Sequence, residues 1–89
     1  MQTVREVEKI IKALANRRRL AILKYLRRVN RATVGSVAEE IKLSFKATSK
    51  HLGVLSAAGL VESEKIGLRV DYYLKEPLHR TTKSALESF

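Results

Sequence analysis

Residues 36–74 read SVAEEIKLSFKATSKHLGVLSAAGLVESEKIGLRVDYYL, and the order of elements in this stretch decides the fold. The S-x-x-E box at its start predicts a short helix over 36–41. A tight turn at 42–43 and a cap at Ser44 then predict a longer helix over 44–58. Two helices joined by so short a turn are typical of a helix-turn-helix.

The periodicity of the apolar residues changes after Gly59, which stands where a left-handed C-cap is needed. The runs 60–65 and 69–74 read as strands, and Ile66-Gly67-Leu68 supplies the turn between them. This hairpin forms a wing over 60–74 beside the two helices. We therefore predict a mainly α fold with a small β-hairpin wing, a winged helix-turn-helix in the order α-α-α-α-β-β-α. In such a unit the helix over 44–58 enters the major groove of DNA.

Capping residues and apolar spacing place the remaining elements. They are a helix over 4–15 capped by Thr3, a helix over 16–30 opened by Asn16, an extended connector at 33–35, and a last helix over 78–89 after Pro77. With 89 residues, 45% of them hydrophobic, we expect one domain over 1–89. A monomer of this size buries only about 60–65% of its unfolded surface, so a dimer interface would add stability.

Eighteen Lys and Arg residues against nine Asp and Glu residues give a net charge of +9. Such an excess indicates a polyanionic partner, although a basic surface can also serve solubility alone. The apolar runs fall short of the roughly 20 residues that a membrane span needs, and residues 1–10 contain no apolar signal core. We therefore expect double-stranded DNA as the partner and no membrane.

The helix over 44–58 divides into two faces on a helical wheel. Thr48, Leu52 and Leu55 point toward the core, whereas Lys46, Lys50 and Gly53 point outward, with Phe45 and Ser49 on one flank. Outward lysines can displace counterions from phosphates, and Lys and Ser can hydrogen-bond to base edges. A solvated helix face would carry the same residues, but the turn before this helix and the hairpin after it favour DNA contact.

His51, Lys65 and Arg69 complete the candidate DNA contacts. His51 lies toward the inner side of the helix, where we favour a core-edge histidine bonded to backbone over a phosphate or base contact. Lys65 and Arg69 flank the hairpin turn, so they could reach a minor groove or phosphates, or protect an edge strand by charge. Tyr72 and Tyr73 alternate along their strand, so one should pack inward and the other should face out.

The second helix is the other basic element, because positions 16–31 hold seven cations and no acidic residue. The cations are Arg17, Arg18, Arg19, Lys24, Arg27, Arg28 and Arg31. They do not share one face of the helix, so we expect some to contact phosphate, some to be solvated, and none to read bases.

Enzyme chemistry and cofactor sites find little support in these residues. The chain has no cysteine, which excludes disulfides, thiolate metal sites and cysteine nucleophiles. Ser49, Lys50 and His51 are adjacent on a helix, so their side chains diverge and form no triad. His79 and Glu87 are eight residues apart, which is not the spacing of a metal-binding pair on one helix. We expect no catalytic residue, no metal and no cofactor.

These motifs resemble the arsenical-resistance-repressor (ArsR) family of bacterial and archaeal transcription regulators, over about Leu14 to Leu74. LANRRRLAIL at 14–23 is similar to the family's LA(D/N)xxRLxIL motif, and VAEEIKLS at 37–44 is similar to its LAexlglS segment. SKHLGVLSAAGLV at 49–61 is similar to S(R/K)HLxxLxxaGLV, which is fairly specific to winged-helix regulators.

The resemblance implies a homodimer formed by the helices over 4–15 and 78–89, and operator binding through the helix over 44–58. It also implies repression that is relieved by an effector, which the residues do not identify. By position, it assigns DNA contacts to Ser44, Lys46, Ser49 and Lys50, and it makes Arg19 a scaffold residue.

The chain departs from the family pattern in three places. The helix over 37–41 carries no cysteine motif, which argues against sensing of arsenic or soft metals there. Lys42 stands where the turn often has glycine. Phe45 and Gly53 stand at positions that are more often polar: Phe45 could meet a thymine methyl or cover the turn, and Gly53 could permit close backbone approach.

The sequence thus predicts a dimeric, sequence-specific regulator of double-stranded DNA, acting as a repressor that reads an inverted repeat, in the cytoplasm at the nucleoid. A non-specific DNA-coating or architectural protein is the alternative, motivated by the charge spread over the second helix. An interaction module of a larger complex ranks third, because such modules often lose the basic face that this chain keeps.

Overall fold

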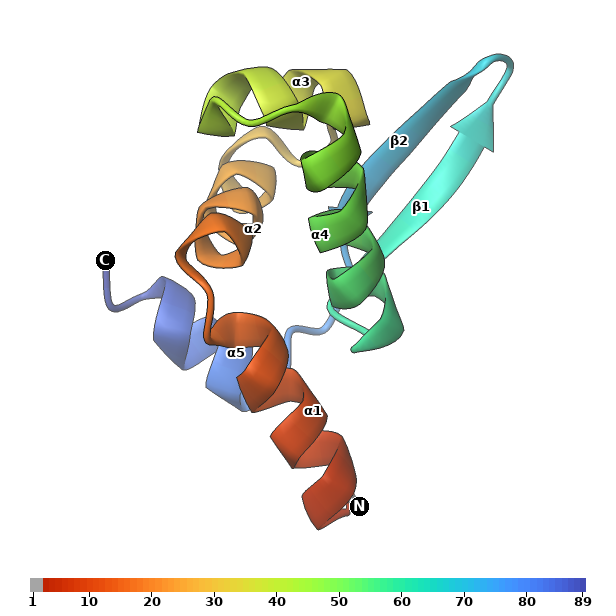
Figure 1. The fold of residues 1–89 in the computed structure, drawn as a ribbon. Helices are drawn as coiled ribbons and strands as arrows, with labels where there is room; N and C mark the ends of the chain where they lie inside the picture. The colour runs from red at the N-terminus through yellow and green to blue at the C-terminus, as the bar shows by residue number, and fades with distance from the viewer. Residues whose placement is uncertain (1–2) are drawn as a thin grey trace.

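The computed structural model describes residues 3–89 and confirms the predicted order of elements (Figure 1). The elements are α1 (Val4–Leu14), α2 (Arg17–Val29), α3 (Val34–Ile41), α4 (Phe45–Ala57), β1 (Val61–Ile66), β2 (Arg69–Leu74) and α5 (Arg80–Leu86). The fold is therefore a winged helix-turn-helix, with five helices and one antiparallel hairpin.

The core lies where α2, α3 and α4 meet, and the hairpin projects from one side of it (Figure 1). Its centre is made of fully buried aliphatic side chains: Ile22, Leu23 and Leu26 of α2, Val37 of α3, Leu52 and Leu55 of α4, and Val61 at the base of the wing. Helices α1 and α5 come from opposite ends of the chain and pack side by side at the other end of the molecule (Figure 1). This arrangement leaves α4 covered on its inner side only.

Three of the predicted helix caps are confirmed. The side chains of Thr3, Asn16 and Ser44 each accept hydrogen bonds from backbone amides in the first turn of α1, α2 and α4. Such bonds satisfy amides that have no partner inside the helix, and each contributes about 1 kcal/mol. Short polar residues before apolar runs therefore located these helix starts correctly.

The start of α3 was predicted wrongly. The helix begins at Val34, not at Ser36, so residues 34 and 35 of the expected extended connector are helical. The Thr33 hydroxyl accepts from the Ser36 backbone amide at 3.2 Å and donates to the Ser36 hydroxyl at 3.2 Å. Thr33 is thus the cap, and Ser36 lies inside the first turn. Two candidate caps three residues apart are hard to rank by sequence, because either can bond to an amide three positions later.

The turn between α3 and α4 depends on a left-handed residue. Lys42 has φ 55° and ψ 52°, the conformation that glycine adopts without steric cost. Its amide donates to the carbonyl of Glu39 at 3.4 Å, which closes the end of α3. Gly59 (φ 76°) plays the same part after α4, as predicted. Both helix ends therefore redirect the chain over one or two residues.

The wing is a regular antiparallel pair. Val61 pairs with Leu74, Glu64 with Asp71, and Ile66 with Arg69, which leaves a two-residue turn at 67–68. The predicted first strand, 60–65, began and ended one residue too early, because Leu60 precedes β1 and Ile66 is its last residue. A backbone bridge from Ala32 to Tyr72 also joins β2 to the segment between α2 and α3. The last helix is shorter than predicted, since it spans Arg80–Leu86 instead of 78–89.

Candidate nucleic-acid interface

Helix α4 is held against the core by the three residues that the helical wheel assigned to its inner face. Thr48, Leu52 and Leu55 each have 0% of their surface exposed. Burying a leucine side chain contributes about 1.5–3 kcal/mol, so two such residues fix the rotation of α4 about its axis. The outward face is therefore determined by packing and does not depend on a ligand.

The predicted outward residues are all exposed. Lys46, Ser49, Lys50 and Gly53 lie on the open side of α4. Neither Lys46 nor Lys50 makes an ion pair or a side-chain hydrogen bond with the rest of residues 3–89, so both ammonium groups remain available to an external anion. Apart from its chain neighbours and the nearby backbone of α4, no heavy atom lies within 4 Å of the place a Cβ of residue 53 would occupy, so the packing around Gly53 does not require a glycine.

Ser44 and Phe45 stand at the start of α4, where the chain leaves the turn. The Ser44 hydroxyl accepts from the Ala47 amide at 3.1 Å, and its own proton is left to donate elsewhere. Phe45 has 64% of its surface exposed. It lines a shallow apolar groove with Val34 on one side and Leu68 and Val70 of the wing on the other. Apolar surface is therefore continuous between the start of α4 and the wing.

His51 is half-buried on the inner edge of α4. Its Nδ1 lies 3.4 Å from Nη1 of Arg19, so its partner is a side chain and not the backbone group that we expected. Burial, together with the positive charges of Arg19, Arg18 and Lys50, lowers the pKa of His51 below its ordinary value. The neutral ring is therefore favoured at neutral pH, and it can accept a hydrogen bond from Arg19.

Arg19 joins α1, α2 and α4. Its Nε donates to the Ala13 carbonyl at 2.6 Å and its Nη2 to the Lys12 carbonyl at 3.1 Å, so it caps the C-terminal end of α1. The same guanidinium reaches His51 on α4. The scaffold role that the family resemblance implied for Arg19 agrees with these contacts.

The other cations at positions 16–31 are also mostly occupied by protein groups. Arg18 donates to the Ile41 carbonyl, Lys24 to the Leu86 and Phe89 carbonyls, and Arg27, Arg28 and Arg31 pair with Glu87, Glu40 and Glu64 respectively. We expected part of this set to contact phosphate and part to be solvated. Six of the seven, all except Arg17, also tie α2, or Arg31 two residues after its end, to neighbouring elements.

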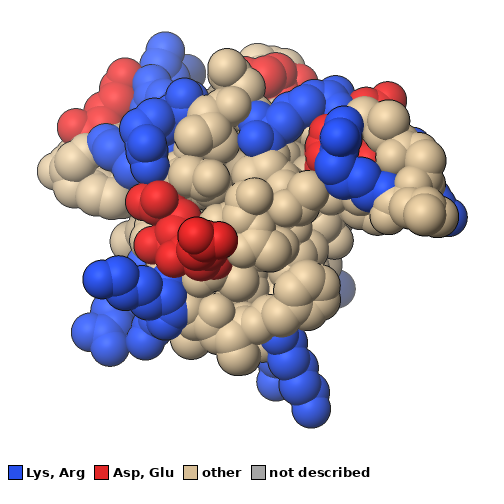
Figure 2. Space-filling view, turned by 90° about the horizontal axis from the view of Figure 1, so that it is seen from above, with Lys and Arg blue, Asp and Glu red and all other residues tan. Residues whose placement is uncertain are grey.

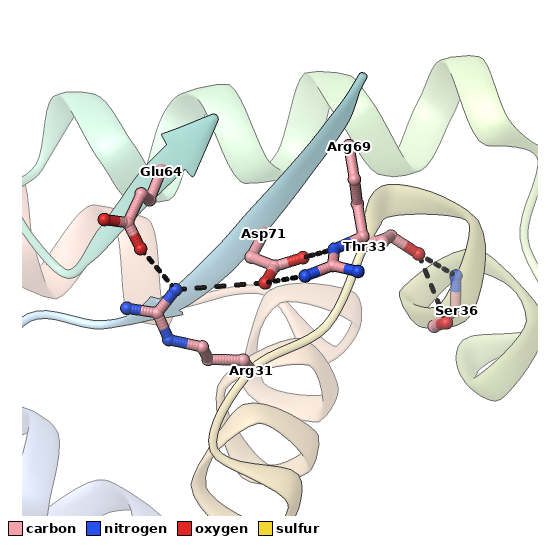
Figure 3. A network of polar contacts seen from close by, with 6 residues as sticks. All are labelled: Arg31, Thr33, Ser36, Glu64, Arg69 and Asp71. Atoms are coloured by element: carbon pink, nitrogen blue, oxygen red, sulfur yellow. Dashed lines mark hydrogen bonds and ion pairs between the residues drawn. The ribbon is translucent and has the colours of Figure 1, made fainter. Parts of the chain in front are cut away.

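The two predicted wing cations lie on opposite faces of the hairpin. Lys65 is paired with Val70, whereas Arg69 is paired with Ile66 and shares its face with Asp71. Nε of Arg69 donates to Oδ1 of Asp71 at 2.8 Å, and Nη2 lies 3.4 Å from Oδ2 (Figure 3). The wing therefore presents one free lysine and one arginine that a carboxylate holds.

Asp71 belongs to a network that the sequence did not predict. Its carboxylate, only 10% exposed, lies between the guanidinium groups of Arg69 and Arg31 (Figure 3). Nη1 of Arg31 is 3.8 Å from Oδ2 of Asp71 and 2.7 Å from Oε1 of Glu64, and the Arg31 guanidinium lies 4.5 Å from the Tyr73 ring centre. The only available signal was an acidic residue two positions after an arginine in one strand, which places both on one face.

Tyr72 and Tyr73 divide as predicted. Tyr72 packs against the core, and Tyr73 lies on the opposite face, under Arg31.

On the face of the molecule that Figure 2 shows, the positive charges are not gathered into one patch. Seen from the side of α3, Lys and Arg form several separate groups, some of them beside Asp or Glu, with uncharged surface between (Figure 2). Net charge alone therefore does not locate an interface on this face.

The described part of the chain contains neither a metal-binding group nor a membrane-spanning helix. Within residues 3–89, no three His, Asp or Glu side chains come together in a group that could hold a metal ion. No helix among these residues is long and apolar enough to span a membrane.

Comparison with known proteins identifies the family. The family model for bacterial regulatory proteins of the arsR family matches residues 16–63, which include α2, α3, α4 and the start of the wing. Among curated sequences, the transcriptional activator HlyU of Vibrio cholerae is 42% identical over 65 residues. That alignment covers 73% of this chain and 59% of the HlyU sequence, so it spans less than two thirds of the relative.

Solved structures agree with this match. The structure of HlyU from Vibrio cholerae has a TM-score of 0.78 and 34% identity, and the superposition covers 94% of this chain and 87% of that one. A homodimeric winged helix-turn-helix DNA-binding domain from Mycobacterium bovis has a TM-score of 0.79 and 28% identity, with 98% and 82% covered. NolR from Sinorhizobium fredii gives 0.81 and 26%, with 99% and 92% covered. The chain therefore belongs to the ArsR family of bacterial regulatory proteins and is a winged helix-turn-helix transcriptional regulator.

Proposed function

We propose that this protein is a homodimeric repressor that binds an inverted repeat in double-stranded DNA. The observation that carries the proposal is the pair of lysines on α4, Lys46 and Lys50, which are exposed and free on a helix fixed by buried residues. A rigid helix with free cations one turn apart fits the major groove, which is about 12 Å wide.

Each proposed contact has a role that follows from its position. Lys46 and Lys50 meet phosphates or guanine edges, and Ser49, on the flank of the same face, can donate to or accept from a base. Ser44 donates to a phosphate at the start of α4, where the helix dipole also favours an anion. Phe45, exposed beside the groove, meets a thymine methyl.

The remaining contacts flank α4. His51 lies on the side of the helix near Arg19, so we give it a phosphate contact at the edge of the interface. Lys65 and Arg69 follow the backbone of the DNA beyond the major groove, from the two faces of the wing.

Dimerisation through α1 and α5 accounts for an apolar surface that the monomer leaves uncovered. Val4 is 88% exposed and Ile11 is 50% exposed, and together with Val7 they line one side of α1. Helix α5 packs beside α1, so a second copy could cover both. The related domain from Mycobacterium bovis is homodimeric. A two-fold dimer would place its recognition helices about 34–36 Å apart, one turn of DNA.

Selection of bound duplexes from a random library, at physiological salt and followed by sequencing, tests the proposal. We expect enrichment of an inverted repeat whose half-sites are about 10–10.5 base pairs apart. Specific regulators bind their sites at least about 10³-fold more tightly than other DNA. A retained but unenriched pool would contradict sequence reading and indicate a coating protein that contacts only the backbone.

The direction of regulation needs a separate test, because HlyU is described as an activator. We expect repression, since a dimer of this size on a promoter blocks polymerase without contacting it. A reporter gene should be placed behind a promoter that contains the selected repeat and measured with and without the protein. Increased transcription would contradict the proposed repression while leaving the DNA-binding proposal intact.

A further inference from the structure

Asp71 holds the exposed guanidinium of Arg69 in one orientation. Arg69 has a side chain that is 58% exposed, whereas the carboxylate that binds it is 10% exposed. Asp71 uses Nε and Nη2 of Arg69, so the Nη1 group is left for another acceptor. On the other side of the carboxylate, Arg31 compensates the charge that Asp71 carries into the interior.

The same network connects the wing to the helix-turn-helix. Arg31 and Ala32 belong to the segment that joins α2 to α3: Ala32 exchanges two backbone hydrogen bonds with Tyr72, at 3.1 and 2.8 Å. Arg31 contacts Glu64 of β1 and Asp71 of β2 at once (Figure 3). Thr33, which follows Ala32, is the N-cap of α3. Asp71 therefore sits where the orientation of the wing is set relative to the helix pair.

We propose that Asp71 is a positioning residue for DNA recognition: it fixes the guanidinium of Arg69 so that its unused Nη1 group meets the DNA at a defined place beside the α4 site. This inference rests on the DNA-binding function proposed above. A free arginine side chain would lose conformational entropy on binding, and the bond to Asp71 removes most of that loss before DNA arrives.

Simple electrostatics predicts the opposite effect for this residue. Asp71 is a negative charge near the DNA-facing wing, so its removal should strengthen binding to any polyanion. A positioning role predicts that its removal weakens binding to the selected repeat and leaves binding to unrelated DNA unchanged or stronger. The ratio of specific to non-specific affinity therefore separates the two accounts.

The test compares three full-length variants on the selected repeat and on a scrambled duplex at one salt concentration. Asp71→Asn removes the charge but keeps the volume, and we expect about a tenfold loss of specific affinity. Arg69→Lys keeps the net charge but cannot make the paired contact, and we expect a similar loss. Glu62→Gln is the control, because it changes the charge of the same hairpin face without touching Asp71 or Arg69. We expect it to lose no specific affinity.

A double variant separates positioning from general damage to the wing. If Asp71 acts through Arg69, adding Asp71→Asn to Arg69→Lys should cost little more than either change alone. Losses that multiply would overturn the proposal. If Asp71→Asn unfolds the protein, Arg69→Lys still tests the proposal, because it changes only an exposed side chain. Wild-type specificity of the Arg69→Lys variant would also overturn the proposal. Absence of specific binding by the unaltered protein would instead overturn the proposed function itself.

Discussion

Helices α2 and α4 have the same length, 13 residues, and both are basic, but they use their cations differently. Arg18, Arg19, Lys24, Arg27 and Arg28 of α2 are all bound to carbonyls or carboxylates of other elements. The two lysines of α4 are bound to nothing in the described chain. On the DNA-binding proposal made above, free cations on an anchored helix, and not the number of cations, mark the candidate DNA contacts.

The difference follows from where the two helices lie. Helix α2 is at the centre of the fold, in contact with α1, α3, α4, α5 and β2. Residues of α1, α3 and the C-terminal segment around α5 offer carbonyls or carboxylates to its long side chains. Helix α4 packs on its inner side and is open on the other (Figure 1). A cation within reach of a carbonyl end of a helix is stabilised there, whereas one on an open face stays solvated until a ligand arrives.

The largest effect that we expect from this comparison is on stability, and it comes from α2. Arg19→Ala removes the bonds to the Ala13 and Lys12 carbonyls and the contact with His51, so it should lower the free energy of unfolding by about 3 kcal/mol. Urea denaturation followed by circular dichroism measures the change. Arg17→Ala is the matched control at the start of the same helix, and we expect it to be close to neutral. Equal stability of the two variants would contradict the scaffold role of Arg19.

The next effect is on binding, and it comes from α4. Lys50→Ala should weaken binding to the selected repeat by about 2 kcal/mol and leave stability unchanged within about 0.5 kcal/mol, because the side chain is exposed and free. Titration of labelled operator DNA measures the affinity, and thermal unfolding measures the stability. Lys46→Ala should behave in the same way. If both variants bind the repeat as the unaltered protein does, the outward face of α4 is not the reading face.

The contrast between the helices also shows what the sequence could predict. The buried face of α4 followed from helical spacing alone, because Thr48, Leu52 and Leu55 repeat at three to four residues and the core decides which side is inward. The free lysines on the opposite face followed from the same wheel. Local signals sufficed here, since every residue involved lies within one helix.

The roles of the α2 cations and of Asp71 could not be predicted in this way. Lys24 bonds to carbonyls more than 60 residues away, and Arg31 reaches Glu64 and Asp71 on two different strands. No helical wheel contains such partners, because they depend on how α5 and the wing pack. The error at α3 was of another kind: Thr33 and Ser36 are both good caps, and the folded chain uses Thr33.

His51 of α4 contacts Arg19 of α2, so its titration tests the contact between the two helices. Its pKa is lowered in the folded protein by burial and by neighbouring cations, whereas the unfolded value is about 6.5. The unfolded state therefore takes up the proton more readily, and stability should fall as the pH drops below about 6.5. Denaturation midpoints at several pH values between 5 and 8 measure this slope. In His51→Gln, which keeps an acceptor for Arg19, the slope should be shallower, and an unchanged slope would assign it to other groups.

The smallest effect that we expect is from Arg28→Ala, and it is the strictest test of the comparison. Arg28 is an exposed cation of α2, 64% exposed and paired with Glu40 at 3.2 Å. An exposed ion pair contributes less than about 1 kcal/mol, so stability should change little. Affinity for the repeat should also stay within about twofold, because on our account α2 does not contact DNA. The same titration, repeated at two salt concentrations, measures the loss and the salt slope. A loss as large as that of Lys50→Ala, with a shallower slope, would show that α2 binds phosphate and that the distinction between the two helices is wrong.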